Sequence, residues 1–174
     1  MRRIHVIGTS GTGKSTVGAA LAGRLGVPFV ELDALHWLPG WTTRPPDELR
    51  RLLTDATAGD GWVVDGNYGA WVRELLWPRV DAVVWLDLPR RTALRQVTTR
   101  TFGRWWRREL LWGTNRESLR MSLLSRESIL WWTWSTHARR RAGYAVLLAD
   151  PPFEVIRLRT RAEVDRWLAS VPSR

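Results

Sequence analysis

The segment of residues 8–15 constrains this chain more than any other, because it reads GTSGTGKS. It follows a short apolar run at residues 4–7 and precedes residues 14–25, where apolar side chains recur at helical spacing. The pattern GxxxxGK[ST] between a strand and a helix is typical of a loop that wraps phosphate groups. Its glycines let successive main-chain N–H groups converge on an oxyanion, and the positive end of the helix points at the same place. The spacing excludes a dinucleotide-binding loop, which requires GxGxxG.

This motif predicts a nucleotide site with defined roles for its side chains. Lys14 is expected to reach the β and γ phosphates of ATP, and the Ser15 hydroxyl to hold Mg²⁺. Lys14 is also the only lysine in a chain with 27 basic residues, so a compact ammonium is kept at this one position. The residues expected to bind ATP are Gly8, Thr9, Ser10, Gly11, Thr12, Gly13, Lys14, Ser15 and Thr16.

Two aspartates follow apolar runs and are candidates for the chemistry around the phosphates. Asp65 comes after residues 62–64 and before Gly66, as a carboxylate that supports Mg²⁺ should. Asp33 follows the apolar run at residues 27–32, where it could orient an acceptor hydroxyl or accept its proton. The alternative for both is an ordinary capping role at the start of the next element.

Strand-like and helix-like segments alternate through the chain. We expect strands at residues 4–7, 27–32, 62–64, 82–86 and 155–158, and helices at 14–25, 47–58, 70–77, 90–102, from near 117 onward, and at 161–169. Residues 144–148 fit either a last helical turn or a strand. The alternation predicts an α/β fold with three layers, a five-stranded parallel sheet covered by helices on both faces. At 174 residues we expect a single domain, residues 1–174.

The positive charge is concentrated in residues 90–141. This segment holds thirteen arginines and three glutamates, so it accounts for the whole net charge of +10. Such a field favours a polyanionic partner, either nucleotide phosphates or a nucleic-acid backbone. The alternative is a merely solvated face.

Arginines within this segment recur at helical spacing. Arg100, Arg104 and Arg108 would form one stripe on a helix, and Arg116 lies beyond Gly113. Phosphoryl transfer requires such groups to neutralise charge, so we expect these four arginines in a catalytic role, together with Lys14 and Asp33. Surface ion pairing is the alternative for each arginine. Tryptophans, including Trp105, Trp106, Trp131 and Trp132, lie among these charges. We favour packing for them over stacking on a base.

Composition excludes several other classes of protein. The chain has no cysteine, which rules out disulfides, thiolate zinc sites and cysteine nucleophiles. No apolar run reaches the length of about 18 residues that spans a bilayer, and the N-terminal residues lack the apolar core of a signal peptide. We therefore expect a cytoplasmic protein with no membrane partner.

In these motifs the chain resembles the adenylate kinase branch of P-loop kinases. More narrowly, it resembles the adenylate-kinase-related, topology-modulation (FlaR-like) proteins. The stretches that carry the resemblance are LDALHWLPGW, WVVDGNY, RTFGR and NRES. It implies ATP and Mg²⁺ at the phosphate loop and an arginine-rich helical lid at about residues 100–118. The acceptor stays open, because Asn67-Tyr68-Gly69 stands where adenylate kinases have Phe-Pro-Arg.

The function expected from the sequence is ATP- and Mg²⁺-dependent phosphoryl transfer to a small-molecule or nucleotide acceptor. The alternative is an ATP-binding protein that associates with nucleic acid through residues 90–141 and has little kinase turnover. The two differ in their dependence on Lys14 and on salt concentration.

Overall fold

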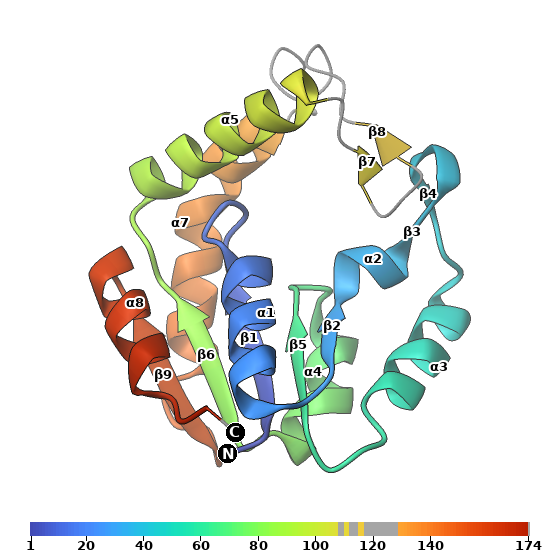
Figure 1. Ribbon diagram of the computed structural model, residues 1–174, viewed down its shortest axis with the longest axis vertical. Coiled ribbons are helices and arrows are strands. Elements are labelled where there is room, and N and C mark those ends of the chain that lie inside the picture. Colours follow the sequence, from blue (N-terminus) through green and yellow to red (C-terminus); the bar gives the residue numbers. More distant parts are fainter. Residues whose placement is uncertain (108–109, 112–114, 117–128, 174) are drawn as a thin grey trace.

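The computed structural model describes residues 1–107, 110–111, 115–116 and 129–173 (Figure 1). Strands and helices alternate along most of the chain. In order they are β1 (Arg3–Gly8), α1 (Lys14–Leu25), β2 (Phe29–Glu31), α2 (Leu32–His36), β3 (Trp37–Leu38), η1 (Pro39–Trp41), β4 (Thr42–Thr43), α3 (Pro46–Ala56), β5 (Trp62–Asp65), α4 (Ala70–Leu76), η2 (Trp77–Arg79), β6 (Ala82–Leu86), α5 (Arg90–Trp106), β7 (Leu110–Leu111), β8 (Asn115–Arg116), α7 (Ile129–Leu147), β9 (Glu154–Leu158) and α8 (Arg161–Ser170).

Five strands form one parallel sheet in the order β2-β5-β1-β6-β9. The central strand is β1, which pairs with β5 on one side and with β6 on the other. Because the strands are parallel, their carboxyl ends meet at one edge, and the phosphate loop follows β1 in the middle of that edge. The predicted five-stranded parallel sheet is confirmed.

Side chains alternate between the two faces of the sheet, and each face has its own core. On one face α1 and α8 pack through Val17, Leu21 and Val164 against strand residues that include Val84. On the other face α3 and α4 cover β2 and β5, and α7 covers β1 and β6, with Val83 and Trp85 pointing to that side. Figure 1 shows this helix–sheet–helix layering, which confirms the predicted three layers.

A buried ion pair anchors α7 to the sheet. Asp87 lies directly after β6, and its carboxylate accepts hydrogen bonds from Arg141 of α7 at 2.6 and 3.1 Å. It also accepts from Arg157 of β9 at 3.0 and 2.7 Å. Because both oxygens of Asp87 are occupied in this way, this strand-end aspartate has a structural role.

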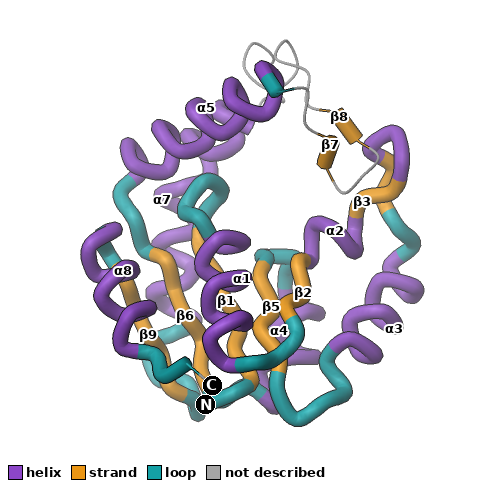
Figure 2. Tube along the Cα trace, viewed as in Figure 1, coloured by secondary structure: helices purple, strands orange, loops and turns teal. Residues whose placement is uncertain are grey.

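Above the carboxyl edge, the elements differ from the sequence-based expectation. Helix α5 continues through Gly103 to Trp106 instead of ending near residue 102, since a glycine inside a helix costs only about 1 kcal/mol. The lid expected to be helical over residues 100–118 contains a two-stranded hairpin, β7–β8, after the end of α5. A second hairpin, β3–β4, was not predicted. Figure 2 shows the β3–β4 and β7–β8 hairpins beside each other. Residues 144–147 belong to α7, which resolves the open assignment in favour of a helix.

In the part of the chain that the structure describes, no helix combines the length and the apolar character needed to cross a lipid bilayer.

Candidate active site

The phosphate loop is built by the main chain between β1 and α1. The Thr9 carbonyl accepts hydrogen bonds from the Thr12 amide at 3.3 Å, the Thr12 hydroxyl at 2.9 Å and Lys14 Nζ at 3.3 Å. Gly13 is the N-cap of α1, with φ 86°, and it has no side chain to accept from the first-turn amides. Those amides are therefore available to an anion, which fits phosphate.

Gly11 allows α5 to approach the loop closely. Its φ is +79°, and a Cβ placed there would lie 2.4 Å from both the Ala93 carbonyl oxygen and Val97 Cγ2. Any other residue would displace α5 or distort the loop. The glycine at this position of the motif is thus required by packing as well as by the turn.

Charged groups of several elements converge on Lys14. Burial lowers the pKa of its ammonium, Asp65 and Asp33 raise that pKa, and Arg100 and Arg140 lower it. The two carboxylates and the two arginines therefore act on the same ammonium from β5, α2, α5 and α7. Two positive groups near a lysine are the charge distribution that an anionic ligand stabilises.

Ser15 and two strand-end carboxylates form a group of oxygen ligands. Ser15 Oγ donates to Glu31 Oε1 at 3.2 Å, and Glu31 is the register partner of Asp65 on β5. Burial raises the pKa of Asp65 to about 6, while Ser15 and Lys14 lower it. Oxygen donors of this kind suit Mg²⁺. Among the described residues no three His, Asp or Glu side chains are arranged to hold a metal by themselves, so phosphate and water oxygens would complete the shell.

His5 of β1 supports the loop that follows Asp65. Trp77 Nε1 donates to His5 Nδ1 at 3.1 Å, so Nε2 carries the proton and donates to the Gly66 carbonyl at 3.0 Å. Burial lowers the pKa of His5 to about 4, which keeps the ring neutral. Asn67 in the same loop accepts from the Gly8 amide at 3.4 Å and donates to the Gly8 carbonyl. These hydrogen bonds connect the phosphate loop to the loop that follows β5.

The side expected to take the acceptor lies around Asp33, which is exposed on α2. The Tyr68 hydroxyl donates to Asp33 Oδ1. Burial and the Asp33 charge raise the pKa of Tyr68 well above its usual range, so the hydroxyl stays protonated. The ring centroids are 4.7 Å apart for Tyr68 and His36, 4.8 Å for His36 and Trp37, and 5.5 Å for Trp37 and Trp41. These rings make an aromatic wall beside the carboxylate.

The four arginines expected to be catalytic occupy different places. Arg100 lies on α5 close enough to act on Lys14, and Arg104 follows one turn later on the same helix. Arg116 belongs to β8 of the hairpin beyond α5, so it does not continue the stripe. Arg108 lies outside the described residues.

The expected packing of the arginine-rich segment's tryptophans is wrong for several of them. The exposed fractions are 43% for Trp105, 73% for Trp106, 55% for Trp131 and 46% for Trp132. Trp105 and Trp106 contact Phe102 and each other. Helices α5 and α7 therefore carry aromatic surface among their arginines.

Sequence reasoning missed three residues of this site. Glu31 is the last residue of β2, two positions before Asp33, and nothing in the sequence marked it as a site residue. Tyr68 was noted only as a departure from the adenylate kinase pattern. Arg140 lies 40 residues from Arg100 in the sequence, and only the packing of α7 against α5 brings it to Lys14.

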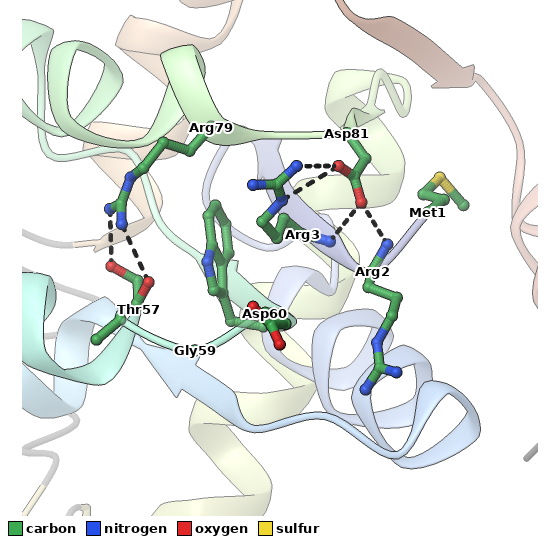
Figure 3. A pocket seen from close by; sticks show the side chains of 10 residues that line it. Met1, Arg2, Arg3, Thr57, Gly59, Asp60, Arg79 and Asp81 are labelled. Carbon is green, nitrogen blue, oxygen red and sulfur yellow. Dashed lines mark hydrogen bonds and ion pairs between the residues drawn. The ribbon is translucent and has the colours of Figure 1, made fainter.

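A separate cavity of about 490 Å³ lies at the opposite edge of the sheet (Figure 3). Several of its polar side chains pair with one another: Arg3 with Asp81 at 2.9 Å, and Arg79 with the Thr57 hydroxyl at 3.0 Å. Ligands of open α/β sheets bind at the carboxyl ends of the strands, so this cavity is not the candidate active site.

Comparison with known proteins agrees with the fold. Residues 4–64 match the model of the ATPase family associated with various cellular activities. An uncharacterized protein of Bacillus subtilis (strain 168), YqaC, is 32% identical over 118 residues, which cover 67% of this chain and 66%, just under two thirds, of that protein.

Two solved kinases have similar structures. A shikimate kinase from Bacteroides thetaiotaomicron has a TM-score of 0.57 at 16% identity, covering 97% of this chain and 94% of that one. A deoxyadenosine kinase from M. mycoides has a TM-score of 0.52 at 16% identity, covering 95% and 96%. At this identity the likeness concerns the fold. The chain thus has the α/β fold of P-loop kinases.

Proposed function

We propose that this protein is an ATP- and Mg²⁺-dependent kinase that transfers a phosphoryl group to a small hydroxyl-bearing acceptor. The observation that carries the proposal is the position of Asp33 and Lys14. The Asp33 charge acts on Lys14 across the carboxyl edge of the sheet. Ser15, next to Lys14, donates to Glu31 at 3.2 Å, and Glu31 lies two residues before Asp33. A carboxylate able to hold a hydroxyl therefore lies at the same edge of the sheet as a lysine able to hold phosphate.

In the proposed mechanism, residues 8–16 bind the phosphates of ATP through main-chain amides. Lys14 and Arg100 neutralise negative charge on the transferred group. Ser15, with Asp65 and Glu31, would hold Mg²⁺, which supplies electrostatic stabilisation of the phosphate oxygens when bound. Asp33, held by Tyr68, orients the acceptor hydroxyl and accepts its proton. The lid arginines Arg104, Arg108 and Arg116 are proposed to complete the charge around the phosphates.

The test is ADP release from Mg²⁺-ATP by the purified protein, alone and with nucleotides, nucleosides, small polyols or DNA. Stimulation by one small acceptor, with formation of its phosphate ester, would support the proposal and identify the substrate. Lys14→Ala is the negative control. A wild-type protein that binds ATP but turns over none of these acceptors would count against kinase activity.

One observation favours the second candidate, an ATP-binding protein that associates with nucleic acid. The exposed tryptophans of α5 and α7 lie among arginines, as in surfaces on which bases stack. The similarity to kinase structures does not indicate nucleic-acid binding. Binding of single-stranded DNA that weakens steeply with salt and persists in Lys14→Ala would favour it.

A further inference from the structure

Asn115 joins the two hairpins that lie above the acceptor side. It belongs to β8, is only 1% exposed, and pairs with Leu111 of β7. Its Oδ1 accepts from the Trp41 amide at 3.0 Å, and its Nδ2 donates to the Leu38 carbonyl at 3.1 Å. One side-chain amide thus uses both its donor and its acceptor on the two ends of a single turn.

That turn has a backbone that needs support. In η1, Gly40 has φ 72°, and Trp41 has φ 59°, which is uncommon for a residue other than glycine. Strained conformations of this kind persist where surrounding contacts hold them. One such contact at Trp41 comes from the side chain of Asn115, which is 74 residues away in the sequence.

The turn is connected to Asp33 by a row of ring contacts. Trp41 contacts Trp37, Trp37 contacts His36, and His36 contacts Tyr68, whose hydroxyl donates to Asp33. Arg44, just after β4, also holds this region, because its amide donates to the His36 carbonyl at 2.8 Å. A shift of Trp41 would therefore displace the neighbouring rings of the aromatic wall.

We propose that Asn115 is a positioning residue that couples the β7–β8 hairpin to the aromatic wall of the acceptor site. This inference rests on the proposed kinase function for its role in catalysis. When Asn115 is docked, the turn at Leu38–Trp41 holds Trp37 against His36, and Tyr68 keeps Asp33 oriented. When it is not docked, the β3–β4 and β7–β8 hairpins lose the two hydrogen bonds that Asn115 makes to Leu38 and Trp41.

A distance measurement tests the coupling without requiring turnover. The chain has no cysteine, so Thr43→Cys and Leu110→Cys, one on each hairpin, provide the only two thiols for spin labels. We expect one narrow distance distribution in the otherwise unchanged protein. Asn115→Ala should broaden it toward longer distances. Asn115→Asp should do the same, because a carboxylate accepts from Trp41 but has no proton for the Leu38 carbonyl.

The matched control is Phe102→Ala, which removes an exposed side chain of α5 that contacts Trp105 and Trp106. It should leave the distance distribution narrow. An unchanged distribution in Asn115→Ala would overturn the proposal, as would equal broadening in Phe102→Ala.

Kinetics with Mg²⁺-ATP alone separate positioning from general damage. Asn115→Ala should keep the KM for Mg²⁺-ATP within about twofold of the wild type. Its acceptor-independent ADP release should rise, because water enters an acceptor site whose wall is no longer held. A KM for ATP that rises in parallel would indicate a merely structural role. If the wild type releases no ADP with any of the acceptors named above, the kinase proposal fails, and the distance measurement still decides whether Asn115 couples the hairpins.

Discussion

The two sides of the candidate site are built in different ways. On the phosphate side the groups proposed to bind the ligand are main-chain amides of one short loop, and the Thr9 carbonyl accepts hydrogen bonds from residues no more than five positions away. On the acceptor side the contacts join distant side chains: Tyr68 reaches Asp33 across 35 residues, and Asn115 reaches Trp41 across 74. The first side is therefore specified locally, whereas the second depends on how the elements pack.

The largest effect should come from the local side. Lys14→Ala should lower ADP release about 10³-fold, because it removes the positive charge that stabilises the transferred group. Lys14→Arg should restore little of this activity, since a planar guanidinium does not replace a compact ammonium. Steady-state ADP release measures both variants. Turnover of Lys14→Ala close to the wild-type value would contradict the assigned role.

On the acceptor side, Asp33→Asn should lower turnover about 10²-fold, because the proton acceptor is lost. Tyr68→Phe should cost about tenfold, since it removes one hydrogen bond to that carboxylate. Affinity for ATP, measured by calorimetry, should change in neither variant. Asp47→Asn on the exposed start of α3 is the control. An equal loss of turnover in Asp47→Asn and Asp33→Asn would contradict a specific role for Asp33.

Asp65 should show opposite effects on activity and stability. Its folded-state pKa of about 6 lies above the ordinary value of 3.8, so ionisation of Asp65 destabilises the folded protein as pH rises from 4 through 6. Asp65→Asn should therefore raise the free energy of unfolding at pH 8 by on the order of 2 kcal/mol, measured by denaturant titration. The gain should vanish near pH 4, while Mg²⁺-dependent turnover falls at every pH. A stability difference that is the same at both pH values would show that burial of the charge is not its cause.

The smallest effect is expected at Trp106, which is 73% exposed on α5. Trp106→Ser should change the free energy of unfolding by no more than about 0.5 kcal/mol, because little buried area is lost. Turnover should also be unchanged if the kinase proposal holds. Loss of single-stranded DNA binding in this variant would instead strengthen the second candidate.

The locally specified parts are also those that could be predicted from the sequence. The phosphate loop, α1 and the parallel strands follow from glycine spacing and apolar runs, and all were predicted. Glu31, Tyr68 and Arg140 could not be assigned, because their places depend on strand register and on helix packing. The two hairpins have strands of only two residues, too short for a periodic signal.

The exposed tryptophans were misjudged for a related reason. The large apolar area of tryptophan favours burial on average. Helices α5 and α7, however, pack against each other, and their buried positions include small or polar residues such as Ala93, Thr101 and Thr133. The rings of Trp105 and Trp106 consequently lie on the outside of α5. Residue type alone does not reveal which face of a helix meets its neighbour.

The close contact between Gly11 and α5 has a consequence for how the site can move. With Ala93 and Val97 against the phosphate loop, the first turns of α5 form one rigid body with it. Rotation of α5 about the junction before Arg90 would break this contact with Gly11. Arg100 lies one turn beyond Val97 on the same helix, so the packing of Gly11 against α5 also sets where Arg100 stands relative to Lys14.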